Sequence, residues 1–75
     1  MKSSVLQGII QRLEAMTHTQ NEKEVRRFEV DGVEKCQVAY LLESDSFEMT
    51  DSQSGATFQF DDIDLVAIEI YEMLG

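Results

Sequence analysis

The hydrophobic residues follow two different periods along the chain. Near both ends they recur every three or four residues, which is the period of an amphipathic helix. Between Glu24 and Phe60 they alternate with polar residues, which is typical of strands that bury one face. The 75 residues therefore predict a single small α+β domain over residues 1–75. We expect a two-layer sandwich, in the order αββββα, with the N-terminal and C-terminal helices packed on one face of a four-stranded antiparallel meander.

The N-terminal helix is predicted to begin at Ser4, because Ser4 and Gln7 have the spacing of a capping box. Its apolar residues fall on one face of a helical projection, away from the polar ones. This face consists of Val5, Leu6, Ile9, Ile10, Leu13 and Met16. We expect it to pack against the sheet.

The registers of the last two hairpins follow from keeping the apolar residues on one face, since a slip of one residue would move every side chain to the other face. A four-residue loop at 43–46 pairs Leu42 with Phe47 and Tyr40 with Met49, and a loop at 52–55 pairs Met49 with Phe58 and Phe47 with Phe60. The predicted inner face is Phe28, Cys36, Val38, Tyr40, Leu42, Phe47, Met49, Phe58 and Phe60. The outer face is polar except for Ala39 and Leu41.

The first hairpin contains the dipeptide Asp31-Gly32, which is typical of a two-residue type I′ turn. Strict pairing around such a turn would place Phe28 with Lys35 on the polar face. A three-residue loop with a bulge at the glycine returns Phe28 to the face of Cys36. We therefore predict the longer loop.

The C-terminal helix is predicted from a cap at Asp61 and a core stripe. The stripe consists of Ile63, Val66, Ala67, Ile70 and Leu74. With Asp61 as the cap, Phe60 and Leu65 occupy the positions of a hydrophobic staple. Alternation in IDLVAIEI also fits a strand, but the cap, the staple and the length favour a helix.

Two surfaces are candidate interfaces. Ile68, with Tyr71 beside it and Leu65 nearby, lies away from the core stripe of the last helix and forms a small apolar patch. Ala39 and Leu41 lie on the outer face of the sheet. Such residues either mark an interface or are isolated exposed apolar side chains of the kind that soluble proteins tolerate.

The charge is unevenly distributed. All six basic residues lie within residues 1–35, whereas residues 36–75 contain nine carboxylates and no Lys or Arg, so the second half carries the whole net charge of −9. Such a surface repels nucleic-acid phosphates and anionic lipid, and we expect neither nucleic acid nor membrane as a partner. It is either a solvated acidic face, a docking surface for a basic protein or a mimic of nucleic-acid charge.

No residue pattern predicts catalysis, a cofactor or a metal. Cys36 is expected to be buried, and His18 is a single histidine in a polar linker. Helix capping accounts for Asp61, Asp62 and Asp64 without a cation. We expect no enzymatic activity. One cysteine and no apolar leader indicate a reducing, cytoplasmic setting.

The sequence resembles the YkuJ-like family of small Firmicutes proteins. The resemblance rests on the segments FEVDG, CQVAY, FEMT and FQFDDIDLVAIEIYE and covers essentially the whole chain. It implies a two-layer domain with an antiparallel sheet flanked by the terminal helices. It implies no biochemical activity and no functional residues.

The sequence therefore predicts an interaction protein. We expect a homodimer that buries Ile68, Leu65 and Tyr71, or Ala39 and Leu41, against a second copy. The alternative is a monomeric acidic adaptor or inhibitor that docks on a basic protein through the surface from Glu43 to Glu72.

Overall fold

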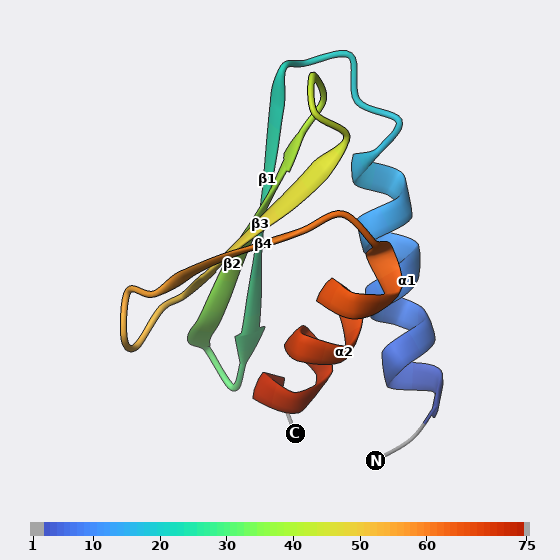
Figure 1. Ribbon diagram of the computed structural model, residues 1–75. Coiled ribbons are helices and arrows are strands. Elements are labelled where there is room, and N and C mark those ends of the chain that lie inside the picture. Colours follow the sequence, from blue (N-terminus) through green and yellow to red (C-terminus); the bar gives the residue numbers. More distant parts are fainter. Residues whose placement is uncertain (1–2, 75) are drawn as a thin grey trace.

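The computed structural model describes residues 3–74 and shows the predicted order of a helix, four strands and a helix. The elements are α1 (Ser3–Met16), β1 (Lys23–Val30), β2 (Val33–Leu41), β3 (Ser46–Asp51), β4 (Thr57–Phe60) and α2 (Ile63–Leu74). The strands form one antiparallel sheet in the order β1-β2-β3-β4 (Figure 1). The predicted αββββα architecture is confirmed.

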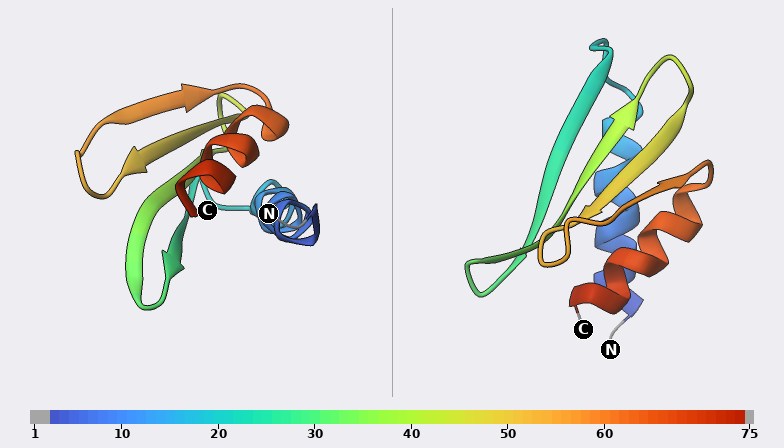
Figure 2. Two further views of the ribbon diagram at one scale, coloured as in Figure 1. Left: turned by 90° about the horizontal axis from the view of Figure 1, so that it is seen from below. Right: turned by 60° about the vertical axis from the view of Figure 1, so that its left-hand side comes forward.

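Both helices lie on the same side of a curved sheet (Figure 2). α2 lies within the curve and contacts all four strands, while α1 packs along α2. α1 is also tied to β1, because Arg12 Nη2 donates a hydrogen bond to the carbonyl oxygen of Arg27 at 3.0 Å. The Arg12 guanidinium lies 4.1 Å from the centroid of the Phe28 ring, within range of a cation–π contact.

The hydrophobic core lies between the concave face of the sheet and the two helices. It consists of Ile9, Leu13, Met16, Phe28, Cys36, Val38, Tyr40, Phe47, Met49, Val66, Ala67 and Ile70. Three residues of the predicted inner face are less buried. Phe60 is half-buried, Phe58 is 47% exposed beside the sheet edge, and Leu42 is 39% exposed because it lies in a turn.

The β2–β3 register differs by two residues from the prediction. Tyr40 pairs with Phe47 and Val38 with Met49, and the loop occupies residues 42–45. Asp45 closes this turn with a φ of 50°, a conformation that aspartate tolerates, and accepts a 2.5 Å hydrogen bond from the Tyr40 hydroxyl. A shift of two residues preserves the faces. The predicted β3–β4 pairing, Met49 with Phe58 and Phe47 with Phe60, is confirmed.

The longer loop predicted for the first hairpin is wrong. Asp31 and Gly32 have φ values of 52° and 80° and form a two-residue turn of the type I′ kind. Phe28 nevertheless pairs with Cys36, because the register shifts between Phe28 and Glu29 and leaves Lys35 as the extra residue. The bulge lies within the strand and not at the glycine.

The predicted caps are also displaced. α1 begins at Ser3, so Ser4 lies inside the helix and is not its N-cap. The cap of α2 is Asp62, whose Oδ1 accepts a 2.8 Å hydrogen bond from the backbone N–H of Asp64. With this cap the predicted staple is lost, and Leu65 is 55% exposed.

The position of the cap can be tested by substitution. Asp62→Ala should lower the free energy of unfolding by about 1 kcal/mol, because the N–H of Asp64 loses its acceptor. Asp61→Ala, next to it, should cost less than half as much, because Asp61 contributes only its charge near the helix end. Urea unfolding followed by circular dichroism measures both. Equal losses, or a larger loss for Asp61→Ala, would contradict the assignment.

Candidate interaction surfaces

Cys36 is placed as a core residue and not as a reactive one. Its side chain is buried in the second strand. Burial raises the pKa of the thiol to about 11, and the negative charges of Asp51 and Glu34 add to the shift. A thiol with such a pKa is a poor nucleophile at neutral pH.

Glu34 and Tyr40, the other two groups with shifted pKa values, form structural contacts. Glu34 accepts a 2.5 Å hydrogen bond from Ser52 Oγ and lies 3.4 Å from Arg27 Nε, and this pairing lowers its pKa, with the Ser52 bond as the main cause. The bond from Tyr40 to Asp45 raises the pKa of the tyrosine. Across residues 3–74, no group of three or more His, Cys, Asp or Glu is placed to hold a metal.

The outer face of the sheet offers a small apolar surface, on which Val25 is 43% exposed. Ala39 is buried between its cross-strand neighbours Val25 and Glu48. Leu41 is half-buried and lies in a shallow hollow whose other lining residues are polar or charged. The structure therefore separates these two residues from the candidate patch on α2.

The patch on α2 continues onto α1. Ile68 is 45% exposed and, with Leu6, Ile10 and Asp64, lines a groove of about 220 Å³ between the two helices. Leu65 is more exposed still, whereas Tyr71 is half-buried against the core. The helical period predicted that Leu6 and Ile10 lie on the core face of the first helix. The signal in the sequence that could have indicated this groove was the width of the apolar face of the first helix. A face of six apolar residues is wide enough to leave some of them outside a single contact.

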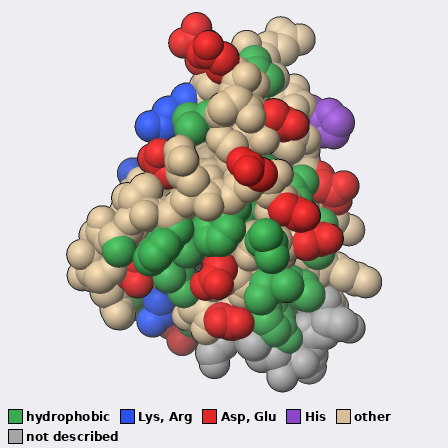
Figure 3. Space-filling view, viewed as in Figure 1, with side chains coloured by type: hydrophobic (Ala, Val, Ile, Leu, Met, Phe, Trp, Pro, Cys, Tyr) green, Lys and Arg blue, Asp and Glu red, His purple; other side chains and the backbone are tan. Residues whose placement is uncertain are grey.

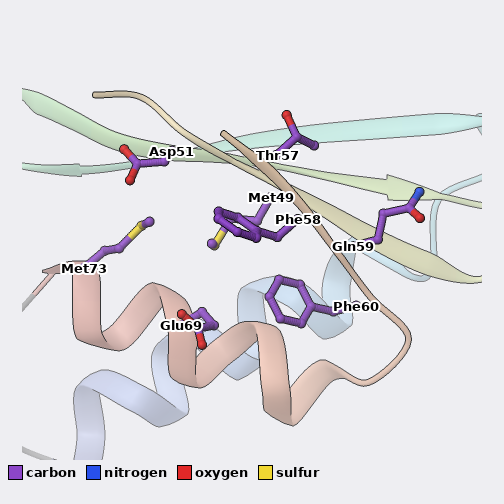
Figure 4. A pocket seen from close by; sticks show the side chains of 8 residues that line it. All are labelled: Met49, Asp51, Thr57, Phe58, Gln59, Phe60, Glu69 and Met73. Atoms are coloured by element: carbon purple, nitrogen blue, oxygen red, sulfur yellow. The ribbon is translucent and has the colours of Figure 1, made fainter. Parts of the chain in front are cut away.

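A second, larger groove lies between β4 and α2. It has a volume of about 580 Å³ and is lined by Met49, Asp51, Thr57, Phe58, Gln59, Phe60, Glu69 and Met73. The side chains of Met49, Phe58 and Met73 gather between the strand and the helix, while Thr57 and Gln59 point away from α2 (Figure 4). The alternation of residues 57–60 predicted Phe58 and Phe60 on the inner face of the sheet, and no pattern in the sequence indicated this groove.

Acidic side chains accompany the apolar ones on this side of the molecule. Figure 3 shows hydrophobic side chains gathered over β4 and α2 with Asp and Glu among them, and Lys and Arg only along one margin of the view. From Thr57 to Leu74 the chain contains five carboxylates and no Lys or Arg. The groove therefore lies in a strongly negative field.

Comparison with known proteins identifies the family. Residues 9–74 match the model of a family described as "Protein of unknown function (DUF1797)". The chain belongs to this family. It is 44% identical over 77 residues to "Uncharacterized protein YkuJ" of Bacillus subtilis (strain 168), an alignment that covers 95% of this chain and 98% of that protein. The resemblance found in the sequence is confirmed.

A solved structure supports the fold. The x-ray structure of the YkuJ protein from Bacillus subtilis superimposes with a TM-score of 0.86, at 44% identity, over 92% of this chain and 95% of that one. Within the part of the chain described by the structure, no helix is long and apolar enough to cross a membrane. The family description assigns no activity or site residues.

The environment of Cys36 predicts slow alkylation. At pH 8 a thiol with a pKa of about 11 is ionised in about one molecule in a thousand, against roughly a quarter for an unfolded cysteine. Iodoacetamide should therefore modify the native protein at least about 100-fold more slowly than the protein in denaturant. Mass spectrometry of timed samples measures both rates. Native alkylation within tenfold of the denatured rate would show that Cys36 is accessible and ionised.

Proposed function

We propose that the protein is a non-catalytic, cytoplasmic interaction module that forms a homodimer through its two helices. The observation that carries the proposal is the apolar surface shared by α1 and α2, where Ile68 meets Leu6 and Ile10 and where Leu65 is 55% exposed. Val5, 44% exposed on the first turn of α1, extends the apolar surface of that helix.

The charge of α1 favours contact with a second copy. Residues 3–16 contain one carboxylate, Glu14, and one cation, Arg12, and are therefore neutral in a chain of net charge −9. A two-fold arrangement that sets α1 of one copy on α2 of the other avoids placing two acidic helices together. Contact through the α2 helices alone would oppose like charges.

Because the domain is small, such an interface would add substantially to its stability. A standard interface buries about 800 Å² per partner, roughly a sixth of the 4924 Å² that this chain exposes. A chain of this length buries only about 60% of its unfolded surface on folding, so the additional burial would raise its stability through mass action.

The non-catalytic role is supported by the polar groups. The shifted pKa values of Glu34, Cys36 and Tyr40 are each explained by burial or by contacts that hold the sheet and its turns. None of these residues lines either of the two grooves described above.

The dimer is tested by Ile68→Asp. Light scattering after size exclusion should give about twice the chain mass of 8.6 kDa for the native protein, at low and high salt, and the single-chain mass for the variant. The introduced carboxylate would be buried without a partner in the interface, which is strongly unfavourable.

The control for this experiment is Leu42→Asp. It adds the same charge at an exposed apolar residue in the β2–β3 turn, outside both helices and outside the groove between them, and should leave the dimer intact. A native protein that remains a single chain at every concentration, or an Ile68→Asp variant that keeps the double mass, would refute the helical interface.

A further inference from the structure

We propose that the open edge of β4 binds an extended, basic segment of another protein as a fifth strand. The surface is separate from the helical groove and does not depend on the homodimer. This surface would be the binding site in the alternative role, in which the protein is an acidic adaptor for a basic partner. The binding mode is addition of a peptide strand to a sheet edge, with side chains entering a neighbouring groove.

The hydrogen-bonding groups of β4 are positioned for this mode. The N–H of Asp51 donates to the carbonyl oxygen of Ala56 at 2.9 Å, so Asp51 directs its main-chain groups toward the β4 side. In an antiparallel ladder this direction alternates, and the pairs Met49 with Phe58 and Phe47 with Phe60 are bonded in the same way. The main-chain N–H and C=O groups of the intervening residues of β4 therefore face outward.

These outward groups belong to Thr57 and Gln59. No strand of residues 3–74 lies beyond β4. An incoming strand can therefore donate to and accept from two residues of the edge, which is four main-chain hydrogen bonds in a fully formed ladder. Main-chain bonds of this kind give affinity without requiring a particular sequence.

The two edges of the sheet differ in how they are defended. β1 contains charged side chains along its length, with Lys, Arg and Glu at five of its eight positions, a common protection against edge pairing. β4 is Thr-Phe-Gln-Phe and has no charge, no proline and no bulge. Its length of four residues, against eight in β1, limits how far a partner strand can pair with it, and this edge borders the larger groove.

The groove favours an apolar side chain on the added strand. Phe58 is directed to the same side of the sheet as α2, yet it is 47% exposed because the helix leaves space beside it. A residue opposite Phe58 on an added strand would direct its side chain to that same side. There it would meet Phe58 and Met73 and fill part of the 580 Å³ hollow.

The groove also specifies positive charge. Glu69 on α2 and Asp51 at the end of β3 line it with the apolar residues (Figure 4). Lys35 lines a smaller, adjacent hollow with Asp51 and Met73, but residues 57–74 contain no cation that could neutralise Glu69. Lys or Arg two residues from the apolar side chain would lie on the same side of the added strand and face these carboxylates.

A second copy of this chain fits the edge poorly. Its β1 carries basic residues, but it also carries Glu24 and Glu29, and pairing of β1 with β4 is heterologous, so it would build a ring or an open filament and not a closed pair. Pairing of β4 with β4 is closed, but it would bring two acidic grooves together. The charge of the groove therefore favours a different, basic protein.

The test begins with a phage-displayed library of random octapeptides selected on the full chain. We expect enrichment of sequences in which an apolar residue and Lys or Arg occupy alternate positions. The tightest synthetic peptide should slow hydrogen exchange at the N–H groups of Thr57 and Gln59 by about tenfold or more, and should not protect Val25 or Arg27 on the opposite edge.

Substitutions separate the backbone contribution from the charge. Gln59→Pro removes an outward N–H without touching the β3–β4 ladder, a position where proline is tolerated, and should weaken the peptide by about tenfold. Val25→Pro makes the same change at the other edge and should leave affinity unchanged. Glu69→Gln should weaken binding roughly threefold to tenfold, whereas Glu72→Gln, on the same helix but outside the groove, should change it less than twofold.

Four outcomes would contradict binding at the β4 edge. No enrichment, enrichment of acidic peptides, exchange protection at β1, or equal binding by Gln59→Pro and native protein would overturn the proposal. The exchange measurement uses the native chain and remains decisive if Gln59→Pro fails to fold. Ile68→Asp should bind the peptide normally, so the edge site stands or falls separately from the helical dimer.

Discussion

The core depends on Phe28 remaining on the concave face of the sheet. The type I′ turn at Asp31-Gly32 would by itself direct Phe28 to the other face, and the extra residue Lys35 reverses this. The Phe28 ring is 1% exposed and lies beneath the guanidinium of Arg12, which also bonds to β1. One bulge therefore allows a tight turn, a filled core and a docked α1 to occur together.

The shape of the sheet and the position of α2 create the larger groove. The β4 end of the sheet lies beside the C-terminal half of α2, where Met73 and Phe58 leave space between them. Residues 57–74 contain five carboxylates and no Lys or Arg, whereas α1 is neutral. Apolar surface and charge thus distinguish the helical face that we propose for a second copy from the sheet edge that we propose for a basic strand.

Much of the fold was predictable because local and global signals agree. The faces of β2 and β3 follow from alternation, and the stripe of Val66, Ala67 and Ile70 on α2 is buried as expected. The predictions failed where several local solutions preserve the same faces. A two-residue slip at the Tyr40–Phe47 pair leaves the pattern unchanged, and Asp61 and Asp62 are equally good caps in the sequence alone.

The sequence by itself determined the order of the elements, the face of each strand that is directed toward the helices and the acidic second half, because these depend on periodicity and composition. Only the tertiary structure decided that Leu6 and Ile10 border Ile68 and that Phe58 remains half exposed. Exposure depends on how far a helix extends over a curved sheet and on which helix lies beside it. Both depend on how side chains from distant segments pack together, and no local sequence pattern contains this information.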